Sequence, residues 1–197
     1  MADPATILVA RHADAAYESR HWADEGGSLT PEGRSQAAHL AGRLHARAVT
    51  HVWTSTMSRA VQTAEIVAAH LGVSVTTREG LREFSVGSFA GSRAEDPFAD
   101  VYGEWLAGHL DLRLPGGETG AELRHRMHHV LFEIAERHAG ETVLAVSHGG
   151  LMRLALPLIL SAEPADPPAR LGNCAVVELA TDGRRWTCLR WPAAPVG

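Results

Sequence analysis

The chain has 197 residues, of which 45% are hydrophobic and 21% are charged, so it can bury the core of one globular domain. Its formal net charge of −5 provides no basic surface for nucleic acid or acidic membranes. All 18 lysine-or-arginine positions are arginine, which excludes a Schiff base, a Walker-type phosphate loop and a Ser-Lys dyad. A bound anion must therefore contact arginine, histidine or backbone amides.

Cysteine content and hydropathy predict a reduced, cytoplasmic protein. Cys174 and Cys188 lack the spacing of metal ligands, and the first residues lack the positive region of a signal peptide. The longest apolar stretch, residues 151–160, contains Arg153 and Pro157 and is too polar to span a bilayer. We expect one domain over residues 1–197.

The N-terminal region predicts a strand followed by a helix. Residues 6–10 are apolar and β-branched, as in a buried parallel strand, and the run ends on Arg11-His12. Thr30-Pro31-Glu32 has the N-cap, first-turn proline and early negative charge of a helix start. One apolar stripe is expected along this helix: Ala37, Leu40, Ala41, Leu44 and Ala48.

A second strand and helix follow the same pattern. Residues 51–54 predict a strand, and the apolar residues between Met57 and Leu71 recur at helical spacing, with Gly72 after them. Residues 73–76 predict a short strand. Residues 84–118 mix glycine, proline, acidic and aromatic residues, so we expect a small insertion or lid there rather than a core element.

The C-terminal region completes an alternation of strands and helices. Residues 118–138 predict a long amphipathic helix, and residues 142–146 a buried strand that ends on Ser147-His148-Gly149-Gly150 before an apolar helix. Residues 174–179 and 186–190 are strand-like and joined through Asp182-Gly183, a hairpin signal. This alternation predicts an α/β fold, a three-layer α/β/α sandwich around a mostly parallel sheet.

Two predicted strands end on histidine, and ligands in open α/β sheets bind at the carboxyl ends of strands. Composition predicts about one Arg-His pair by chance, and four occur, at Arg11-His12, Arg20-His21, Arg124-His125 and Arg137-His138. Only the first follows a buried strand. Taken singly, His12 and His148 are equally compatible with histidines that only complete local hydrogen bonds.

Arg59 is the third polar element at this edge, since it falls in the first turns of the helix after the second strand. Taken alone, it is compatible with a solvated helix arginine. Together the three segments would bring two arginines, two histidines and helix N-termini to one edge of the sheet. Such a site suits a phosphoryl group, which Gly149 and Gly150 would allow close to the backbone.

Six short motifs occur in a defined order along the chain. They are Arg11-His12, Leu29-Thr-Pro-Glu-Gly33, Ser55-x-x-x-Arg59-Ala-x-Gln-Thr-Ala64, Leu81-Arg-Glu83, Pro115-Gly-Gly-Glu118 and Ser147-His-Gly-Gly150. With these motifs in this order, the chain resembles the histidine phosphatase superfamily, which is also called the phosphoglycerate mutase-like family. The resemblance favours the phosphatase branch of that family. The resemblance runs from about residue 7 to residue 153, and the remainder is compatible with the family's C-terminal part.

The resemblance implies roles for the matching residues. His12 would be the nucleophile and would take the phosphoryl group as phosphohistidine. Arg11, Arg59 and His148 would neutralise the phosphoryl oxygens, and the Gly149 N–H would add a backbone donor. No metal and no other cofactor is implied, because arginine supplies the positive charge.

Glu83 matches the acid of the family's Leu-x-Glu segment and would protonate the leaving oxygen and then activate water. The chain is shorter than the cofactor-dependent mutases, which favours hydrolysis. Protein phosphohistidine phosphatases have a similar Arg-His-x-Asp-Ala start but generally lack this acid. Glu83 therefore favours a phosphoric monoester hydrolase acting on small phosphorylated metabolites, with protein phosphohistidine phosphatase and phosphoglycerate mutase as the alternatives.

Four positions depart from the family pattern, and one of them is Ala90, which replaces the glutamate of the common Glu-Gly after the acid segment. Ala13 and Ala15 replace the usual glycine and the frequent threonine or serine, and Glu18 stands where many members place a phosphate-contacting asparagine. A carboxylate there would repel a dianion, so we expect the loop to turn Glu18 outward. Arg20 and His21 are candidate substitute contacts, and a solvated loop is an equal alternative.

Two other classes of function are compatible with parts of the sequence. His125, His128 and His129 have helical i, i+3 and i+4 spacing, which predicts a metal-dependent hydrolase, although the apolar stripe of the same helix places His125 and His129 on the solvated face. A catalytically silent phosphate-binding module would keep the same pocket. The hairpin at Asp182-Gly183 suggests a homodimer surface but leaves the oligomeric state open.

Overall fold

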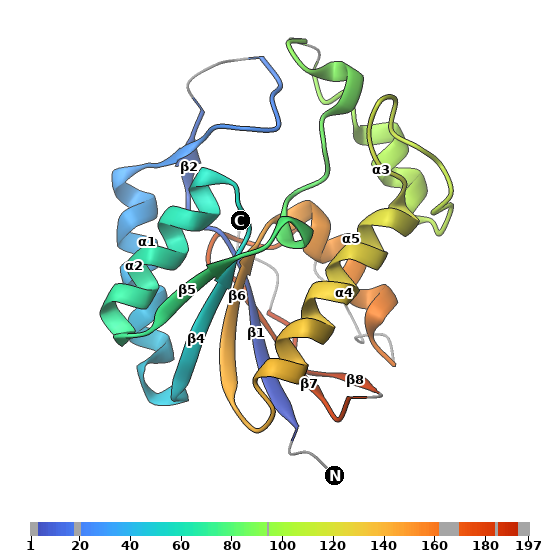
Figure 1. Ribbon diagram of the computed structural model, residues 1–197. Helices are drawn as coiled ribbons and strands as arrows, with labels where there is room; N and C mark the ends of the chain where they lie inside the picture. The colour runs from blue at the N-terminus through green and yellow to red at the C-terminus, as the bar shows by residue number, and fades with distance from the viewer. Residues whose placement is uncertain (1–3, 18–20, 94, 162–169, 184, 193–197) are drawn as a thin grey trace.

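The computed structural model describes residues 4–17, 21–93, 95–161, 170–183 and 185–192. A six-stranded sheet of order β5-β4-β6-β1-β7-β8 lies between two layers of helices (Figure 1). The predicted three-layer α/β/α sandwich with a mostly parallel sheet is confirmed. Within the described ranges, no helix is long and apolar enough to cross a membrane.

The strands of the main sheet match the predicted runs closely. They are β1 (Ala5–Arg11), β4 (Val49–Thr54), β5 (Ser74–Thr77), β6 (Thr142–Ser147), β7 (Val176–Thr181) and β8 (Trp186–Arg190). The pairs β4–β5, β4–β6 and β1–β6 are parallel, whereas β7 pairs antiparallel with β1 and with β8. The predicted C-terminal hairpin is therefore confirmed. Two short strands that the sequence did not predict form a separate pair: β2 (Ala15–Ala16) and β3 (Ser28–Leu29).

The α-helices lie in two layers, one on each face of the sheet (Figure 1). The first layer is α1 (Pro31–Leu44) and α2 (Ser58–Leu71), and the second is α3 (Ala99–Leu106), α4 (Gly120–Arg137) and α5 (Gly149–Ile159). Thr30 caps α1 as predicted, accepting a hydrogen bond from the Gly33 N–H at 2.9 Å. The inclusion of Ala48 in the stripe of this helix was wrong. The helix ends at Leu44, and Ala48 is exposed in the left-handed region, with φ 49°, after a 3-10 turn.

The core forms two clusters, one on each face of the sheet. Because successive side chains of a strand point to opposite faces, Ile7 and Val9 of β1 pack in the cluster that includes α4 and α5. Leu8 and Ala10 pack in the cluster that includes α1 and α2. The continuous apolar run of β1 is therefore explained by burial on both sides.

The expectation that residues 84–118 lie outside the core was wrong. Phe98, Trp105 and Leu114 are buried and belong to the cluster with α4 and α5. The Trp105 indole donates to the Leu112 carbonyl at 2.7 Å. A few large aromatic side chains anchor the segment in the core, and its high glycine and proline content conceals them in the sequence.

The carboxyl ends of three strands meet at the upper edge of the sheet in Figure 1. Arg11 at the end of β1 is in register with Ser147 at the end of β6. The His12 N–H donates to the Ser147 carbonyl at 2.9 Å, and the Ser55 N–H donates to the Val146 carbonyl at 3.0 Å. The first residues after β1, β4 and β6 are thus fixed next to one another.

Candidate active site

A cleft of about 910 Å³ opens at this edge. It is lined by six of the residues selected from the sequence: Arg11, His12, His21, Arg59, Glu83 and Gly149. Phe84 and Phe98 of the 84–118 segment also line it, as does Trp22 of the N-terminal loop. The loop and the segment are joined, since the Trp22 N–H donates to the Ser92 carbonyl and the Gly91 N–H donates to the Trp22 carbonyl, each at 2.9 Å.

His148 is not among the residues that line the cleft, and His21 lines it from an exposed position. His148 is fully buried, with its ring centroid 5.1 Å from that of His12. Arg20 and Glu18 lie outside the described residues. His21 is exposed and accepts a hydrogen bond from the Arg93 guanidinium at 2.8 Å, so this cleft-lining ring is already engaged by a cation.

His12 is held through both ring nitrogens. Its Nδ1 lies 2.7 Å from the Ala13 carbonyl, and the Arg59 Nε lies 3.3 Å from its Nε2. Because a carbonyl only accepts and a guanidinium only donates, Nδ1 carries the proton and Nε2 is unprotonated. Burial, aided by the nearby Arg59 and Arg11 charges, lowers the pKa of His12 from 6.5 to about 4. The imidazole is therefore neutral at neutral pH, with its lone pair on Nε2, where it accepts the hydrogen bond from Arg59.

The alanine at position 13 is compatible with this geometry. Ala13 is fully buried and keeps a negative φ, so the conformation does not require glycine. Its N–H donates to the Thr63 Oγ1 at 3.1 Å. The departure at position 13 thus leaves the His12 backbone in place.

Two buried nitrogens beside His12 lack hydrogen-bond partners among the described residues, namely Arg11 Nε and His148 Nδ1. Arg11 also donates from Nη1 to the Leu171 carbonyl at 2.6 Å, and His148 Nε2 lies 2.8 Å from the Ser55 Oγ. Buried polar atoms are almost always paired in folded proteins. Two unpaired nitrogens near a cleft, together with the Arg59 charge, indicate a binding site for an anion.

Burial lowers the pKa of His148 well below its ordinary value, and the Arg59 charge acts in the same direction. A neutral imidazole carries one N–H. The Ser55 hydroxyl, which already accepts from the Met57 N–H at 3.1 Å, has one proton left to donate to Nε2. In that arrangement the His148 N–H is on the unpaired Nδ1, ready to donate to an anion.

Glu83 lies at the N-terminus of α5. One carboxylate oxygen accepts from the Gly150 N–H at 2.9 Å, and the other accepts from the Leu151 N–H at 2.7 Å and the Phe84 N–H at 3.2 Å. Burial raises the pKa of Glu83 above its ordinary value, and these backbone donors oppose the rise. The cleft therefore combines an imidazole that resists protonation with a carboxyl group that binds a proton more readily than usual, the pattern of an acid and base pair.

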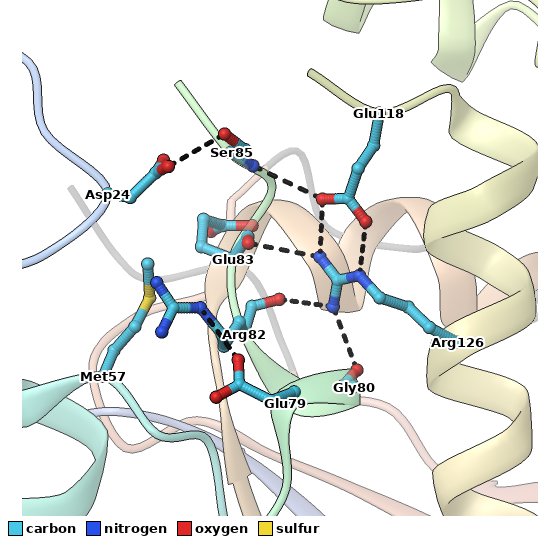
Figure 2. A pocket seen from close by; sticks show the side chains of 9 residues that line it. All are labelled: Asp24, Met57, Glu79, Gly80, Arg82, Glu83, Ser85, Glu118 and Arg126. Carbon is cyan, nitrogen blue, oxygen red and sulfur yellow. Dashed lines mark hydrogen bonds and ion pairs between the residues drawn. The ribbon is translucent and has the colours of Figure 1, made fainter. Parts of the chain in front are cut away.

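Sequence reasoning missed three supporting residues. Ser55 orients His148, and the Ser147 Oγ donates to the Leu81 carbonyl at 2.8 Å, two residues before Glu83. Both serines stand inside motifs that the sequence analysis quoted, so their position after a strand was the available signal. Arg126 on α4, which contacts the segment around Glu83 (Figure 2), had no such signal because it lies in an ordinary amphipathic helix.

The alternative of a metal centre on α4 is contradicted. Within the described ranges, no group of three or more His, Cys, Asp or Glu side chains is placed to hold a metal ion. His125, His128 and His129 are exposed, and the His128 ring packs edge-on against Trp186, with centroids 6.1 Å apart. The helical spacing places these rings on the solvated face, where they do not converge.

Comparison with known families resolves the relationship. The sequence profile of the histidine phosphatase superfamily (branch 1) matches residues 7–194. The chain belongs to the histidine phosphatase superfamily. The match extends the resemblance found in the motifs to almost the whole chain, including the C-terminal hairpin.

Individual relatives include both phosphatases and mutases. The chain is 29% identical to a probable phosphoglycerate mutase, GpmB, of Salmonella choleraesuis, over 97% of this chain and 92% of that protein. It resembles the mycobacterial glucosyl-3-phosphoglycerate phosphatase Rv2419c with a TM-score of 0.78 and 26% identity, over 97% and 100% of the two chains. Bacillus stearothermophilus YhfR matches with a TM-score of 0.77 and 29% identity, over 94% and 95%. These relatives support an activity of the phosphatase or mutase type.

Proposed function

We propose that this protein is a metal-independent phosphoric monoester hydrolase that acts on small phosphorylated metabolites through phospho-His12. One observation carries the proposal. The His12 ring, with Nε2 unprotonated, lies 5.1 Å from the ring of His148, and Arg11 and Glu83 line the same cleft as His12; among the described residues, Arg11 Nε and His148 Nδ1 have no hydrogen-bond partner. A nucleophile, anion donors and an acid are the groups that phosphoryl transfer from an ester requires.

The reaction proceeds in two displacements. In the first, the His12 Nε2 lone pair attacks phosphorus, the P–O ester bond breaks, and the leaving oxygen takes the proton of Glu83. In the second, the Glu83 carboxylate takes a proton from water, the water oxygen attacks phosphorus, and the P–N bond breaks to release phosphate and neutral His12. Glu83 is reprotonated, so the cycle consumes one ester and one water.

The magnitudes fit these roles. A positioned acid contributes roughly 10²–10⁴-fold, because an alkoxide is a poor leaving group. A fixed donor to the developing charge is worth on the order of 3 kcal/mol. Arg11 and His148 supply such donors from the ends of β1 and β6, and Arg59 supplies one from the first turn of α2. Regular secondary structure therefore holds all three in place.

The cleft favours an ester with a sizeable organic part. Its volume of about 910 Å³ exceeds what a phosphoryl group alone would fill. Tyr17, Trp22 and Phe98 offer apolar faces, and Arg153 lines the same cleft with its guanidinium 5.7 Å from the Tyr102 ring. The arginine suits a metabolite with an acidic group, which the phosphoglycerate-type compounds named for the relatives carry, and the aromatic faces suit a further organic part of the ester.

A second candidate function is a phosphoglycerate mutase, which the similarity to GpmB favours. The two activities differ in the acceptor of the phosphoryl group, which is water in one and a second alcohol in the other. Phosphorus-31 NMR of the products from 3-phosphoglycerate distinguishes free phosphate from an isomeric phosphoglycerate. We expect free phosphate to predominate.

The proposal is tested with wild type and His12→Ala on p-nitrophenyl phosphate and on a panel of phosphorylated metabolites, with and without chelator. We expect turnover by wild type that is insensitive to chelator, loss of turnover in His12→Ala, and an acid-labile, base-stable phosphoenzyme in rapidly quenched wild type. Turnover that survives in His12→Ala would overturn the mechanism. Vanadate binding without turnover of any ester would identify a binding module instead.

A further inference from the structure

Arg126 on α4 contacts the main chain on both sides of the proposed acid (Figure 2). Its Nη1 donates to the carbonyls of Gly80 and Arg82 at 3.0 and 2.7 Å. Its Nη2 donates to the carbonyl of Glu83 at 3.2 Å. The same guanidinium thus binds three carbonyls within four consecutive residues.

Glu118 occupies the remaining donors of Arg126. The Arg126 Nε and Nη2 donate to its two carboxylate oxygens at 2.7 and 3.2 Å, so all five N–H groups of the guanidinium are used. Glu118 also accepts a hydrogen bond from the Ser85 N–H at 3.4 Å. The Arg126–Glu118 pair therefore holds the chain from residue 80 to residue 85, with Glu83 inside that span.

This span has open space on two sides. Glu83 lines the large cleft and also a second cavity of about 370 Å³ that lies towards Arg126 and Glu118. Figure 2 shows the side chains around this second cavity. Leu81 anchors the start of this span in the core, but open space lies on both sides of Glu83 itself. Packing alone therefore does not fix the main chain at Glu83, and the hydrogen bonds contribute to its position.

We propose that Arg126, held by Glu118, is a positioning residue that sets the location of Glu83 for proton transfer. The proposal rests on the proposed function, in which Glu83 is the acid. The contacts of Arg126 are to main-chain carbonyls and not to the Glu83 carboxylate, so it acts on position. A misplacement of about 1 Å in a reacting group can lower a rate by about 10²-fold.

Lysine cannot replace Arg126 in this role. An ammonium has three donors without the planar fork that meets a carboxylate and several carbonyls together. Arg126→Lys is therefore informative, because it keeps the charge and removes the geometry. Glu118→Gln is the second variant, since it keeps the shape of the side chain and weakens the pairing.

A matched control exists on the same helix. Glu133 of α4 pairs with Arg78 through two hydrogen bonds, at 2.9 and 2.6 Å, and both side chains are partly exposed, like those of Arg126 and Glu118. Neither control residue lines the cleft. Arg78→Lys and Glu133→Gln thus weaken a comparable ion pair of α4 whose two side chains donate or accept no hydrogen bond to residues 80–85 within the described part of the chain.

The experiment compares kcat/KM for benzyl phosphate and p-nitrophenyl phosphate, which are similar in size. The benzyl alkoxide is a poor leaving group and needs a proton to leave, whereas p-nitrophenolate leaves without one. We expect Arg126→Lys and Glu118→Gln to lower kcat/KM for benzyl phosphate at least about tenfold more than for p-nitrophenyl phosphate. The ratio should stay at the wild-type value in Arg78→Lys and Glu133→Gln. Equal losses on both esters would overturn the proposal.

A double variant tests whether Arg126 acts through Glu83. In a Glu83→Gln background, Arg126→Lys should cause no further change in the benzyl to p-nitrophenyl ratio, because the acid is already absent. A further change would overturn the proposal. Two other results would show that the proposed function itself is wrong: turnover by His12→Ala, or a wild type without activity. A wild type that depends on His12 but shows an unchanged ratio in Arg126→Lys refutes only the positioning role.

Discussion

The two halves of the candidate active site are built in different ways. His12, Arg11 and His148 stand at or directly after the ends of adjacent parallel strands, and their separation follows from the register of β1 and β6. Glu83 lies in an irregular segment and is held by three separate elements. Ser147 binds the chain before it, α5 amides bind its carboxylate, and Arg126 of α4 binds its carbonyl.

This difference predicts two classes of variant. In the proposed mechanism the strand-end half, which is His12, Arg11 and His148 with the neighbouring Arg59, binds phosphoryl oxygens whatever the leaving group is. Damage there should therefore slow all esters alike. The Glu83 half handles one proton, so damage there should slow esters of weakly acidic alcohols more than aryl esters. The ratio of kcat/KM for benzyl and p-nitrophenyl phosphate separates the two halves.

The largest leaving-group effect is expected for Glu83→Gln. The amide keeps the size of the side chain but cannot transfer a proton, so kcat/KM for benzyl phosphate should fall by roughly 10²–10⁴-fold. The loss on p-nitrophenyl phosphate should be much smaller, because p-nitrophenolate leaves without an acid. Steady-state kinetics on both esters measure the ratio, and equal losses would remove Glu83 from the acid role.

Arg59→Met should lower kcat/KM by roughly 10²–10³-fold, because one fixed donor to transition-state charge is worth on the order of 3 kcal/mol. The loss should be the same for both esters. The control is Arg34→Met, which removes an exposed arginine from the first turn of α1. A benzyl-selective loss in Arg59→Met would contradict the division into two halves.

The same division explains what the sequence could predict. Strand ends, helix caps and the hairpin depend on local patterns, and those patterns correctly located β1, β6, α1 and the C-terminal hairpin. The prediction that Ala48 belongs to the helix was wrong because a 3-10 turn ends the helix four residues earlier. The spacing of apolar residues does not reveal such a turn. The prediction for residues 84–118 was wrong because the buried aromatic side chains of this segment follow no regular period.

Within the site, the local motifs identified His12, His148 and Glu83 as residues of one cleft region. They could not identify how Glu83 is held, because the contacts from Arg126 and from the α5 amides join segments more than 40 residues apart. Long-range contacts of this kind leave no periodicity in the chain. The role of Ser55 was missed for a related reason, since its partner His148 lies 93 residues later.

Gly150→Ala should sharpen the comparison with a smaller effect. A Cβ at this position would lie 2.8 and 2.9 Å from the two Glu83 carboxylate oxygens and 2.8 Å from the Phe84 ring, so the carboxylate and the ring must both shift. We expect a loss of about tenfold in kcat/KM for benzyl phosphate, with a smaller loss for the aryl ester. Gly42→Ala in α1 is the control, because nothing lies within 4 Å of the added methyl. Identical kinetics in the two variants would show that proton transfer by Glu83 does not require the present position of its carboxylate.

The pH dependence of the unfolding free energy tests the pKa of His12 in the strand-end half. Burial lowers the pKa of His12 from 6.5 to about 4, so the unfolded chain binds this proton more readily than the folded protein does. His12 therefore contributes stability above pH 6.5 that is lost as the pH falls towards 4. At about 1.4 kcal/mol per pKa unit, the loss is about 3 kcal/mol.

Urea unfolding of wild type and His12→Asn between pH 7 and pH 4 isolates this contribution. The raised pKa of Glu83 has the opposite sign and favours the folded state as the pH falls, but it is common to both proteins and cancels in their difference. We expect the unfolding free energy of wild type to fall by about 3 kcal/mol more than that of His12→Asn over this range. Parallel profiles would mean that His12 titrates normally. Its lone pair would then be only partly available near neutral pH, and the strand-end half would not hold the nucleophile in its reactive form.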